Sequence, residues 1–297
     1  MELRQVKGNT WVLEDWQLTP LYKLDHRQCI LLDSGYYGQR GAMEGALSEA
    51  GLQVVGVLGS HAHNDHASNH RYFRREHGAE VVMSMGEAAL CCTMENMKAY
   101  FFMDTLASLE ENQWVNHMQL RVDRVILPEE TTCTMAGVAF DILHLPGHSP
   151  DHIGVRTPDG IVYLADALLT SDELRRTRLP YHFCHRQAIA SLEGLKKVEG
   201  SGFIAAHRGV LEELGSLPEE NIAHLRAIAA RMANLMEEPI HIGEFNLRAC
   251  ALFQLTSRQP GPVAMYERNI RAMLEYLLEE GLVEAIPKDG IFYYQKR

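Results

Sequence analysis

The segment from Ser60 to His66 constrains this chain more than any other. It places three histidines and one aspartate within six consecutive positions, directly after the apolar run from Val54 to Gly59. Buried polar side chains are costly unless they have partners, so a buried strand that ends in this cluster favours a shared cation as the partner. Neutral imidazole binds zinc and similar cations well. The segment therefore predicts a metal site at a strand end rather than a solvated polar turn.

The spacing within this segment predicts two ions. In an extended segment His61 and His63 project to the same side and can reach one ion. Asp65 and His66 come next, where we expect a helix with Asp65 as its N-cap to run to Glu76. These two side chains lean toward a second position.

Three later apolar segments also end in a candidate ligand: His148, Asp166 and His207. A strand, helix, strand order precedes the first cluster, which indicates an α/β arrangement with its site at the strand ends. We expect His152 to support the turn at His148 through a hydrogen bond.

The order of these motifs resembles the metallo-β-lactamase superfamily. The matching elements are His61-x-His63-x-Asp65-His66, His148 in a Gly-His-Ser context, Asp166 and His207 after apolar strands, and Asp33 in Leu32-Asp33-Ser34-Gly35. The resemblance covers about residues 1–215. It implies an α/β fold, the αββα sandwich, with a two-metal centre at one edge of two facing sheets.

The resemblance also implies a role for each ligand. One metal takes His61, His63 and His148, the other takes Asp65, His66 and His207, and Asp166 bridges both. Asp33 is implied as an anchor rather than a ligand, and Asp65 as the catalytic residue that orients the nucleophile. Two divalent ions, zinc first with iron and manganese as alternatives, lower the pKa of bound water from 15.7 toward about 7.

Four residues are candidates for substrate contact. Arg208 occupies a position where many family members have glycine. Its guanidinium either lies as a cation near the mouth of the site or forms an ion pair on the surface. Tyr181, His182 and His185 lie between the last two motifs. They either contact substrate or belong to a loop packed on the sandwich.

Residues 86–120 are helix-prone and rich in soft apolar side chains. These include Met94, Met97, Tyr100, Phe101, Phe102 and Met103. Packing in the core or in a homodimer is the commoner use of such residues, and an acyl or aromatic substrate pocket is the alternative.

Residues 216–297 form a predicted second domain. A capping-box pattern with proline starts a helix at residue 216, two further helices are expected over 243–254 and after Pro260, and a turn at 287–290 joins a hairpin. This element content resembles a winged helix, found in the lactamase-like endoribonuclease branch, so single-stranded RNA is a candidate partner. The third helix carries four glutamates beside Arg268 and Arg271, which favours a packing or dimer module instead.

The composition narrows the partners and the compartment. The formal net charge of -11 disfavours non-specific binding to a polyanion. No apolar run approaches the roughly 20 residues of a membrane helix, so we expect no membrane association. The six cysteines contain no Cys-x-x-Cys pair, which favours reduced thiols and a cytoplasmic location.

Together these features predict a metal-dependent hydrolase. A hydroxide between two metal ions would attack an ester-type bond of a small molecule, with thioesters of the glyoxalase II kind as first candidates. The alternatives are an endoribonuclease acting on single-stranded RNA and a mono-iron sulfur dioxygenase like the persulfide dioxygenases of the superfamily. The complete set of seven ligands favours two metals over one.

Overall fold

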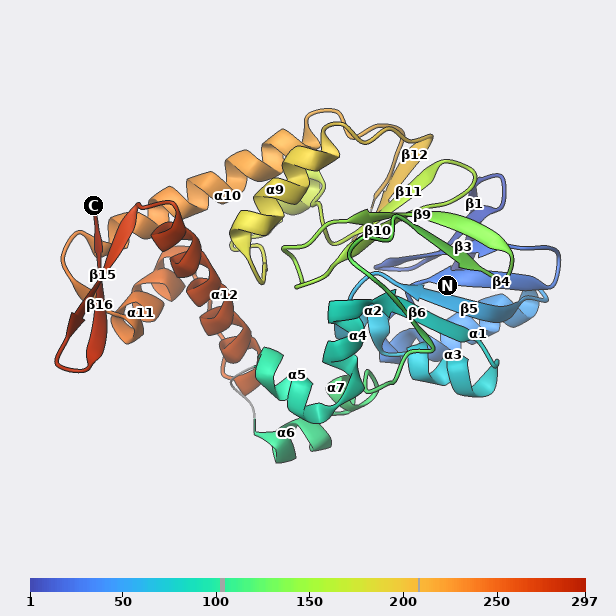
Figure 1. The fold of residues 1–297 in the computed structure, drawn as a ribbon, viewed down its shortest axis with the longest axis horizontal. Helices are drawn as coiled ribbons and strands as arrows, with labels where there is room; N and C mark the ends of the chain where they lie inside the picture. Colours follow the sequence, from blue (N-terminus) through green and yellow to red (C-terminus); the bar gives the residue numbers. More distant parts are fainter. Residues whose placement is uncertain (102–104, 208) are drawn as a thin grey trace.

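Two sheets packed face to face form the body of the protein (Figure 1). The computed structural model describes residues 1–101, 105–207 and 209–297. The first sheet has seven strands in chain order: β1 (Glu2–Lys7), β2 (Thr10–Glu14), β3 (Leu18–Lys23), β4 (Gln28–Leu32), β5 (Gln53–Gly59), β6 (Glu80–Ser84) and β7 (Arg124–Ile126). Strands β1 to β4 pair antiparallel, and β4 to β7 pair parallel.

The second sheet has six strands in the order β13-β12-β11-β10-β9-β8. They are β8 (Thr132–Met135), β9 (Val138–His144), β10 (Ile153–Arg156), β11 (Ile161–Ala165), β12 (Gly202–Ala205) and β13 (Gly209–Leu211). The β11–β12 pair is parallel, so both strands end at the same edge, where Asp166 and His207 follow them.

Apolar side chains from the inner faces of both sheets form one core, which includes Ile30, Leu58, Phe140 and Tyr163. Helices cover the outer faces, among them α1 (Arg40–Glu49) after the 3-10 turn η1 (Tyr37–Gln39) and α9 (His185–Leu195). The short helix α8 (Ser171–Arg176) lies between β11 and α9 in the chain. This arrangement confirms the predicted αββα sandwich.

The helix predicted from Asp65 to Glu76 is interrupted. The structure has α2 (Asn64–Ala67) and α3 (His70–Glu76), and His63 rather than Asp65 is the N-cap of α2. The carbonyl of His66 accepts from the Ser34 backbone N–H at 2.8 Å, and the Asn69 side chain donates to the Ser34 carbonyl at 2.8 Å. These bonds to the β4–α1 connection replace helical ones, so the helix breaks and restarts. Asp65 is thereby free to face the site.

The described part of the helix-prone stretch is helical, as expected, and contains α4 (Met85–Cys92), α5 (Met94–Phe101), α6 (Leu106–Glu111) and α7 (Gln113–Asn116). Met94 and Met97 are buried in a local apolar cluster, as the packing prediction expects. Phe102 and Met103 lie outside the described residues.

The C-terminal region contains the three expected helices and the hairpin, with one additional short strand. Its elements are α10 (Leu217–Ala233), η2 (Asn234–Met236), β14 (Ile240–His241), α11 (Ile242–Phe253), α12 (Pro260–Glu279), β15 (Val283–Lys288) and β16 (Ile291–Lys296). The three strands form an antiparallel sheet in the order β14-β16-β15.

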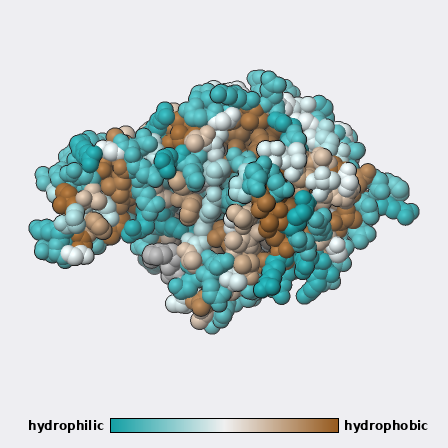
Figure 2. All heavy atoms as spheres, viewed as in Figure 1, coloured by the Kyte–Doolittle hydropathy of each residue, from teal (hydrophilic) through white to brown (hydrophobic). Residues whose placement is uncertain are grey.

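One apolar cluster joins this region to the sandwich across the predicted boundary at residue 215. It includes Leu192 of α9 and Phe203 of β12 together with Met232 of α10 and Met273 of α12. Each fully buried apolar side chain contributes about 1.5–3 kcal/mol, so we expect the two parts to be held firmly together. The outer end of the region projects as a separate lobe with hydrophobic patches on its surface (Figure 2).

None of the helices in the described residues is sufficiently long and apolar to cross a membrane.

Candidate metal centre

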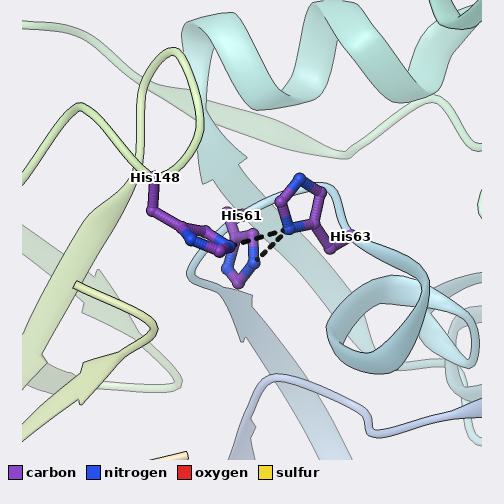
Figure 3. Close-up of side chains that lie close together, drawn as sticks. All are labelled: His61, His63 and His148. Atoms are coloured by element: carbon purple, nitrogen blue, oxygen red, sulfur yellow. Dashed lines mark hydrogen bonds between the residues drawn. The ribbon is translucent and has the colours of Figure 1, made fainter. Parts of the chain in front are cut away.

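Three histidines converge at the edge of the two sheets (Figure 3). His61 and His63 follow β5, and His148 lies in the connection between β9 and β10. His63 Nδ1 is 3.1 Å from His61 Nε2 and 2.9 Å from His148 Nε2. We call these residues the three-histidine group. Two zinc ligands in a tetrahedral site lie about 3.3 Å apart, so the spacing of these nitrogens fits one shared cation.

The hydrogen bonds on the far side of each ring fix which nitrogens carry lone pairs. The Tyr181 carbonyl can only accept, so His148 Nδ1, at 3.1 Å, carries the proton and Nε2 has the lone pair. Ser60 Oγ donates to Asp33 at 2.6 Å and therefore accepts from His61 Nδ1 at 2.9 Å. Both Nε2 lone pairs face one His63 nitrogen, which has at most one proton to offer. A cation satisfies all three.

A second cluster, the carboxylate group, adjoins the first. It consists of Asp65, His66, Asp166 and His207. Asp65 Oδ2 is 3.7 Å from His66 Nε2 and 3.5 Å from His207 Nε2. All seven residues predicted as ligands therefore lie at one edge of the sandwich, in the two groups that the family resemblance implies.

Asp166 lies between the two groups. Its Oδ2 is 3.3 Å from His148 Nε2 and 3.4 Å from His207 Nε2, and its Oδ1 is 3.3 Å from His66 Nε2. The Oδ1 atom is buried and has no hydrogen-bond partner among the described residues. Burying a carboxylate oxygen that has an ion-pair contact with His66 but no hydrogen bond is costly, and cations on both sides would supply stronger partners. Asp166 is thus placed to bridge two ions.

Asp33 anchors the carboxylate group from behind. Its Oδ2 accepts from His66 Nδ1 at 2.7 Å and from the Tyr163 hydroxyl at 2.6 Å, and its Oδ1 accepts from the Ser60 backbone N–H at 2.6 Å. Both oxygens are occupied, and the bond to His66 leaves Nε2 of that ring for a cation. The geometry agrees with the prediction that Asp33 is an anchor and not a ligand.

The electrostatics of the site follow from burial and from the carboxylates. Burial alone would raise the pKa of Asp33, but His66 and the hydrogen bonds from Ser60 and Tyr163 hold it below its usual value. Burial would lower the pKa of His66, yet Asp166, Asp65 and Asp33 raise it well above its usual value. The pKa of His61 is lowered by burial and by its histidine neighbours. The carboxylate group therefore attracts positive charge, whereas the three-histidine group stays neutral.

His152 supports the turn at His148, as predicted, and also the loop of Asp166. Its backbone carbonyl accepts from the Leu145 N–H at 2.8 Å, across the turn that contains His148, and its Nε2 accepts from the backbone N–H of Asp166 at 3.3 Å. The ring is completely buried between the two loops. It thus supports the turn of His148 through its backbone and Asp166 through its ring.

A buried glutamate that the sequence analysis did not identify holds the metal-binding loops together. Glu87 of α4 accepts from the Ala62 backbone N–H at 2.8 Å, from Ser149 Oγ at 2.6 Å and from the Asp151 backbone N–H at 2.9 Å. Its donors flank His61, His63 and His148 in the chain. Burial raises the pKa of Glu87, and these hydrogen bonds oppose that effect. No local pattern marks this residue, because its partners are distant in the sequence.

The four candidates for substrate contact have different positions. The Tyr181 hydroxyl lies 3.3 Å from that of Tyr100 beside the three-histidine group. His182 and His185 are only 7% and 1% exposed and pack in the interior, and the His185 ring lies 6.3 Å from that of Tyr276 on α12. Arg208 lies outside the described residues.

Tyr100 is a further site residue. Its hydroxyl is 2.8 Å from His63 Nε2. Tyr100 belongs to the stretch for which packing is predicted and a substrate pocket is the alternative, and its ring is buried. The apolar pattern of this stretch predicts that the Tyr100 ring is buried, but it does not predict the contact of the Tyr100 hydroxyl with His63.

Two glycines are required where backbone approaches the site closely. A Cβ atom on Gly59 would lie 2.4 Å from His70 Nε2. Gly147 has a φ of +135°, and a Cβ there would lie 2.2 Å from the backbone nitrogen of Ala188 on α9. The residue before His148 must therefore be glycine for this turn to pack against α9.

A hollow of about 690 Å³ adjoins His207. Trp16 forms one wall, with its ring stacked on the His207 ring at a centroid distance of 5.8 Å. The charged residues among its described lining are mostly acidic: Asp172, Glu173, Glu213 and Glu220, with Arg176. Among the described lining residues, His207 is the member of the carboxylate group that faces this hollow.

Comparison with protein families agrees with this geometry. The model of the metallo-beta-lactamase superfamily matches residues 6–207. The chain is 25% identical, over 157 residues, to a protein named hydroxyacylglutathione hydrolase GloC from Haemophilus influenzae, covering 52% of this chain and 68% of that protein.

Solved structures show the same fold over nearly the whole chain. A beta-lactamase domain protein from Burkholderia ambifaria superposes with a TM-score of 0.74 at 16% identity, covering 99% of this chain and 93% of that one. A metallo-beta-lactamase family protein from Thermus thermophilus superposes with a TM-score of 0.68 at 22% identity, covering 95% and 94%. At these identities the likeness concerns the fold, and it includes the C-terminal region.

Proposed function

The chain belongs to the metallo-beta-lactamase superfamily, which includes hydrolases, and we propose that it uses two divalent ions to hydrolyse a thioester of a small molecule. The observation that carries this proposal is the position of Asp166 between two complete ligand groups. The likeness to a protein named hydroxyacylglutathione hydrolase supports a thioester as the substrate. Zinc is the preferred ion because histidine nitrogens and carboxylate oxygens suit it.

The bound ions would supply Lewis acidity and make water reactive near neutral pH. The chain's own residues provide the positioning. The Asp65 side chain is 22% exposed, so its carboxylate can hold a water molecule at the mouth of the site and accept its proton at Oδ2. Burial raises the pKa of Asp65, an effect that His66 opposes.

The hollow beside His207 favours a small substrate with an apolar part. The Trp16 ring offers a flat apolar wall, and Leu211 and Leu214 contribute further apolar surface. The acidic residues of the described lining would repel a chain of phosphates, as would the net charge of -11. These features support a thioester over RNA. The free cysteines support a reducing compartment, and we propose the cytoplasm.

A substrate screen tests this proposal. The zinc-loaded protein is assayed against acyl thioesters, lactones and labelled single-stranded RNA, each with the Asp65→Asn variant as a control. We expect turnover of thioesters that the variant loses. RNA cleavage without thioester turnover would replace the proposal with the nuclease alternative. One iron per chain together with oxygen uptake would replace it with the sulfur dioxygenase.

A further inference from the structure

Helix α12 extends from the C-terminal lobe to the catalytic region, where its first half lies against α5 (Figure 1). Two consecutive residues on this helix, Arg268 and Asn269, contact residues that lie next to the ligands of the three-histidine group. Asn269 is only 4% exposed. A buried amide needs hydrogen-bond partners, and it finds them in the loop that precedes α9.

Asn269 fixes the segment that supports His148. Its Nδ2 donates to the Pro180 carbonyl at 2.9 Å, and its Oδ1 accepts from the His182 backbone N–H at 3.3 Å. These bonds flank Tyr181, whose carbonyl accepts a hydrogen bond from His148 Nδ1 at 3.1 Å. One side chain of α12 therefore positions the carbonyl that sets the orientation and tautomer of a ligand.

Arg268 fixes the residue that supports His63. It donates through Nη1 to the Tyr100 carbonyl at 3.1 Å, and its guanidinium carbon lies 4.5 Å from the centre of the Tyr100 ring and 4.8 Å from that of Tyr181. Cation–π contacts of this kind hold a ring in place. The Tyr100 hydroxyl in turn lies 2.8 Å from His63 Nε2.

The carboxylate group takes its supports from elsewhere. His66 is held by Asp33, and the backbone of Asp166 is held by His152, all within residues 1–215. The two ligand groups are thus supported by different parts of the chain.

From these contacts we infer that the C-terminal region sets the affinity of the three-histidine group for its cation, with Arg268 and Asn269 as positioning residues. Removing a partner that orients a metal ligand typically lowers metal affinity about 10- to 100-fold. The loss falls on one ion and leaves the ion of the carboxylate group in place. This inference concerns metal binding and does not depend on which bond the enzyme cleaves.

The test measures Co²⁺ affinity in the full-length chain. Arg268→Met keeps the aliphatic stem and removes the guanidinium, and Asn269→Leu keeps the approximate volume and removes the hydrogen bonds. Each is combined with His207→Ala, which leaves the three-histidine group complete, and separately with His148→Ala, which leaves the carboxylate group complete. Metal-free protein is titrated with Co²⁺ and followed by its visible absorption, with a competing chelator.

We expect affinity to fall about 10- to 100-fold in the His207→Ala background and to stay unchanged in the His148→Ala background. Arg271→Met is the matched control, because this exposed arginine lies one turn further along α12, and it should change neither. Unchanged affinity in both backgrounds would overturn the inference, and so would an equal loss in both. If Asn269→Leu does not fold, Arg268→Met decides the result, and Tyr100→Phe shows how much affinity is lost when His63 loses its hydroxyl partner.

Discussion

The two ligand groups differ in charge and in what holds them. The three-histidine group has only neutral donors, and its outer partners, Tyr100 and Tyr181, are fixed from the C-terminal helix α12. The carboxylate group includes Asp65 and Asp166, and its anchor, Asp33, lies within the sandwich. The two groups therefore hold a cation in different ways. The carboxylate group attracts its cation by charge, whereas the three-histidine group depends on accurate placement of lone pairs.

The largest effect is expected from the carboxylate group. Asp65→Asn removes the proton acceptor while keeping the size of the side chain, so we predict a loss of about 10²–10⁴ in kcat. Steady-state kinetics with the substrate found in the screen measures this. Asp172→Asn, a change of an exposed carboxylate in the neighbouring hollow, serves as the control and should keep kcat near that of the wild type. A smaller loss in kcat for Asp65→Asn than for the control would show that the charge of this group has no role in the reaction.

The second effect falls on the loops of the three-histidine group. Glu87→Gln replaces one of the two acceptor oxygens with an NH₂ group that cannot accept. Either the bond from the Ala62 N–H to Oε2 or the bonds from Ser149 Oγ and the Asp151 N–H to Oε1 are lost. We predict that the free energy of unfolding falls by about 2–3 kcal/mol. Urea denaturation of the metal-free protein measures it.

Glu95→Gln, on the neighbouring helix α5, is the control for Glu87→Gln and should cost less than about 0.5 kcal/mol. An unfolding free energy equal to that of the wild type would mean that Glu87 does not hold these loops.

The third effect is a dependence of the unfolding free energy on pH, and it comes from His70, which lies behind the carboxylate group. Burial lowers the pKa of His70 to about 4, below its usual 6.5, and His70 Nδ1 lies 2.7 Å from Ser34 Oγ. As the pH falls, His70 therefore takes up a proton in the unfolded chain before it does so in the folded chain. The stability from this residue is complete above pH 6.5 and is lost as pH falls toward 4, by about 2 kcal/mol at pH 5.

His70→Asn removes this titration. We predict a shallower loss of unfolding free energy between pH 7 and pH 5 in the metal-free variant than in the metal-free wild type. Parallel curves for the two proteins would exclude His70 as a source of acid sensitivity.

The smallest effect concerns the wall beside His207. Trp16→Leu keeps an apolar side chain but removes the ring stacked on His207, and such ring contacts are worth about 0.5–1.5 kcal/mol. We predict up to about tenfold weaker Co²⁺ binding at the carboxylate group, with the three-histidine group unaffected. Trp11→Leu, a change away from this group, is the control. An effect of Trp16→Leu on both groups would contradict the separation between them.

The sequence predicted which side chains gather at the site but not which residues support them. His61 to His66, His148, Asp166 and His207 each follow an apolar strand, and a strand end is a local feature that can be recognised without a structure. The supports depend on contacts between distant segments. Arg268 and Tyr100 are 168 positions apart, and Glu87 and Ser149 are 62 apart.

The break between α2 and α3 has the same cause. The sequence predicts one helix to Glu76 with Asp65 as its N-cap, and the bonds of Ser34 and Asn69 lie where the observed helix is interrupted. Tertiary hydrogen bonds outweigh the local helix propensity at this point. The break turns Asp65 toward the candidate metal centre.

The central claim is that two cations lie at one edge of the sandwich with Asp166 between them. An anomalous difference map from crystals of the zinc-loaded protein, recorded at the zinc absorption edge, tests it directly. We predict two peaks, one among His61, His63 and His148 and the other among Asp65, His66 and His207, with Asp166 facing both. A single peak, or peaks away from these residues, would contradict the account.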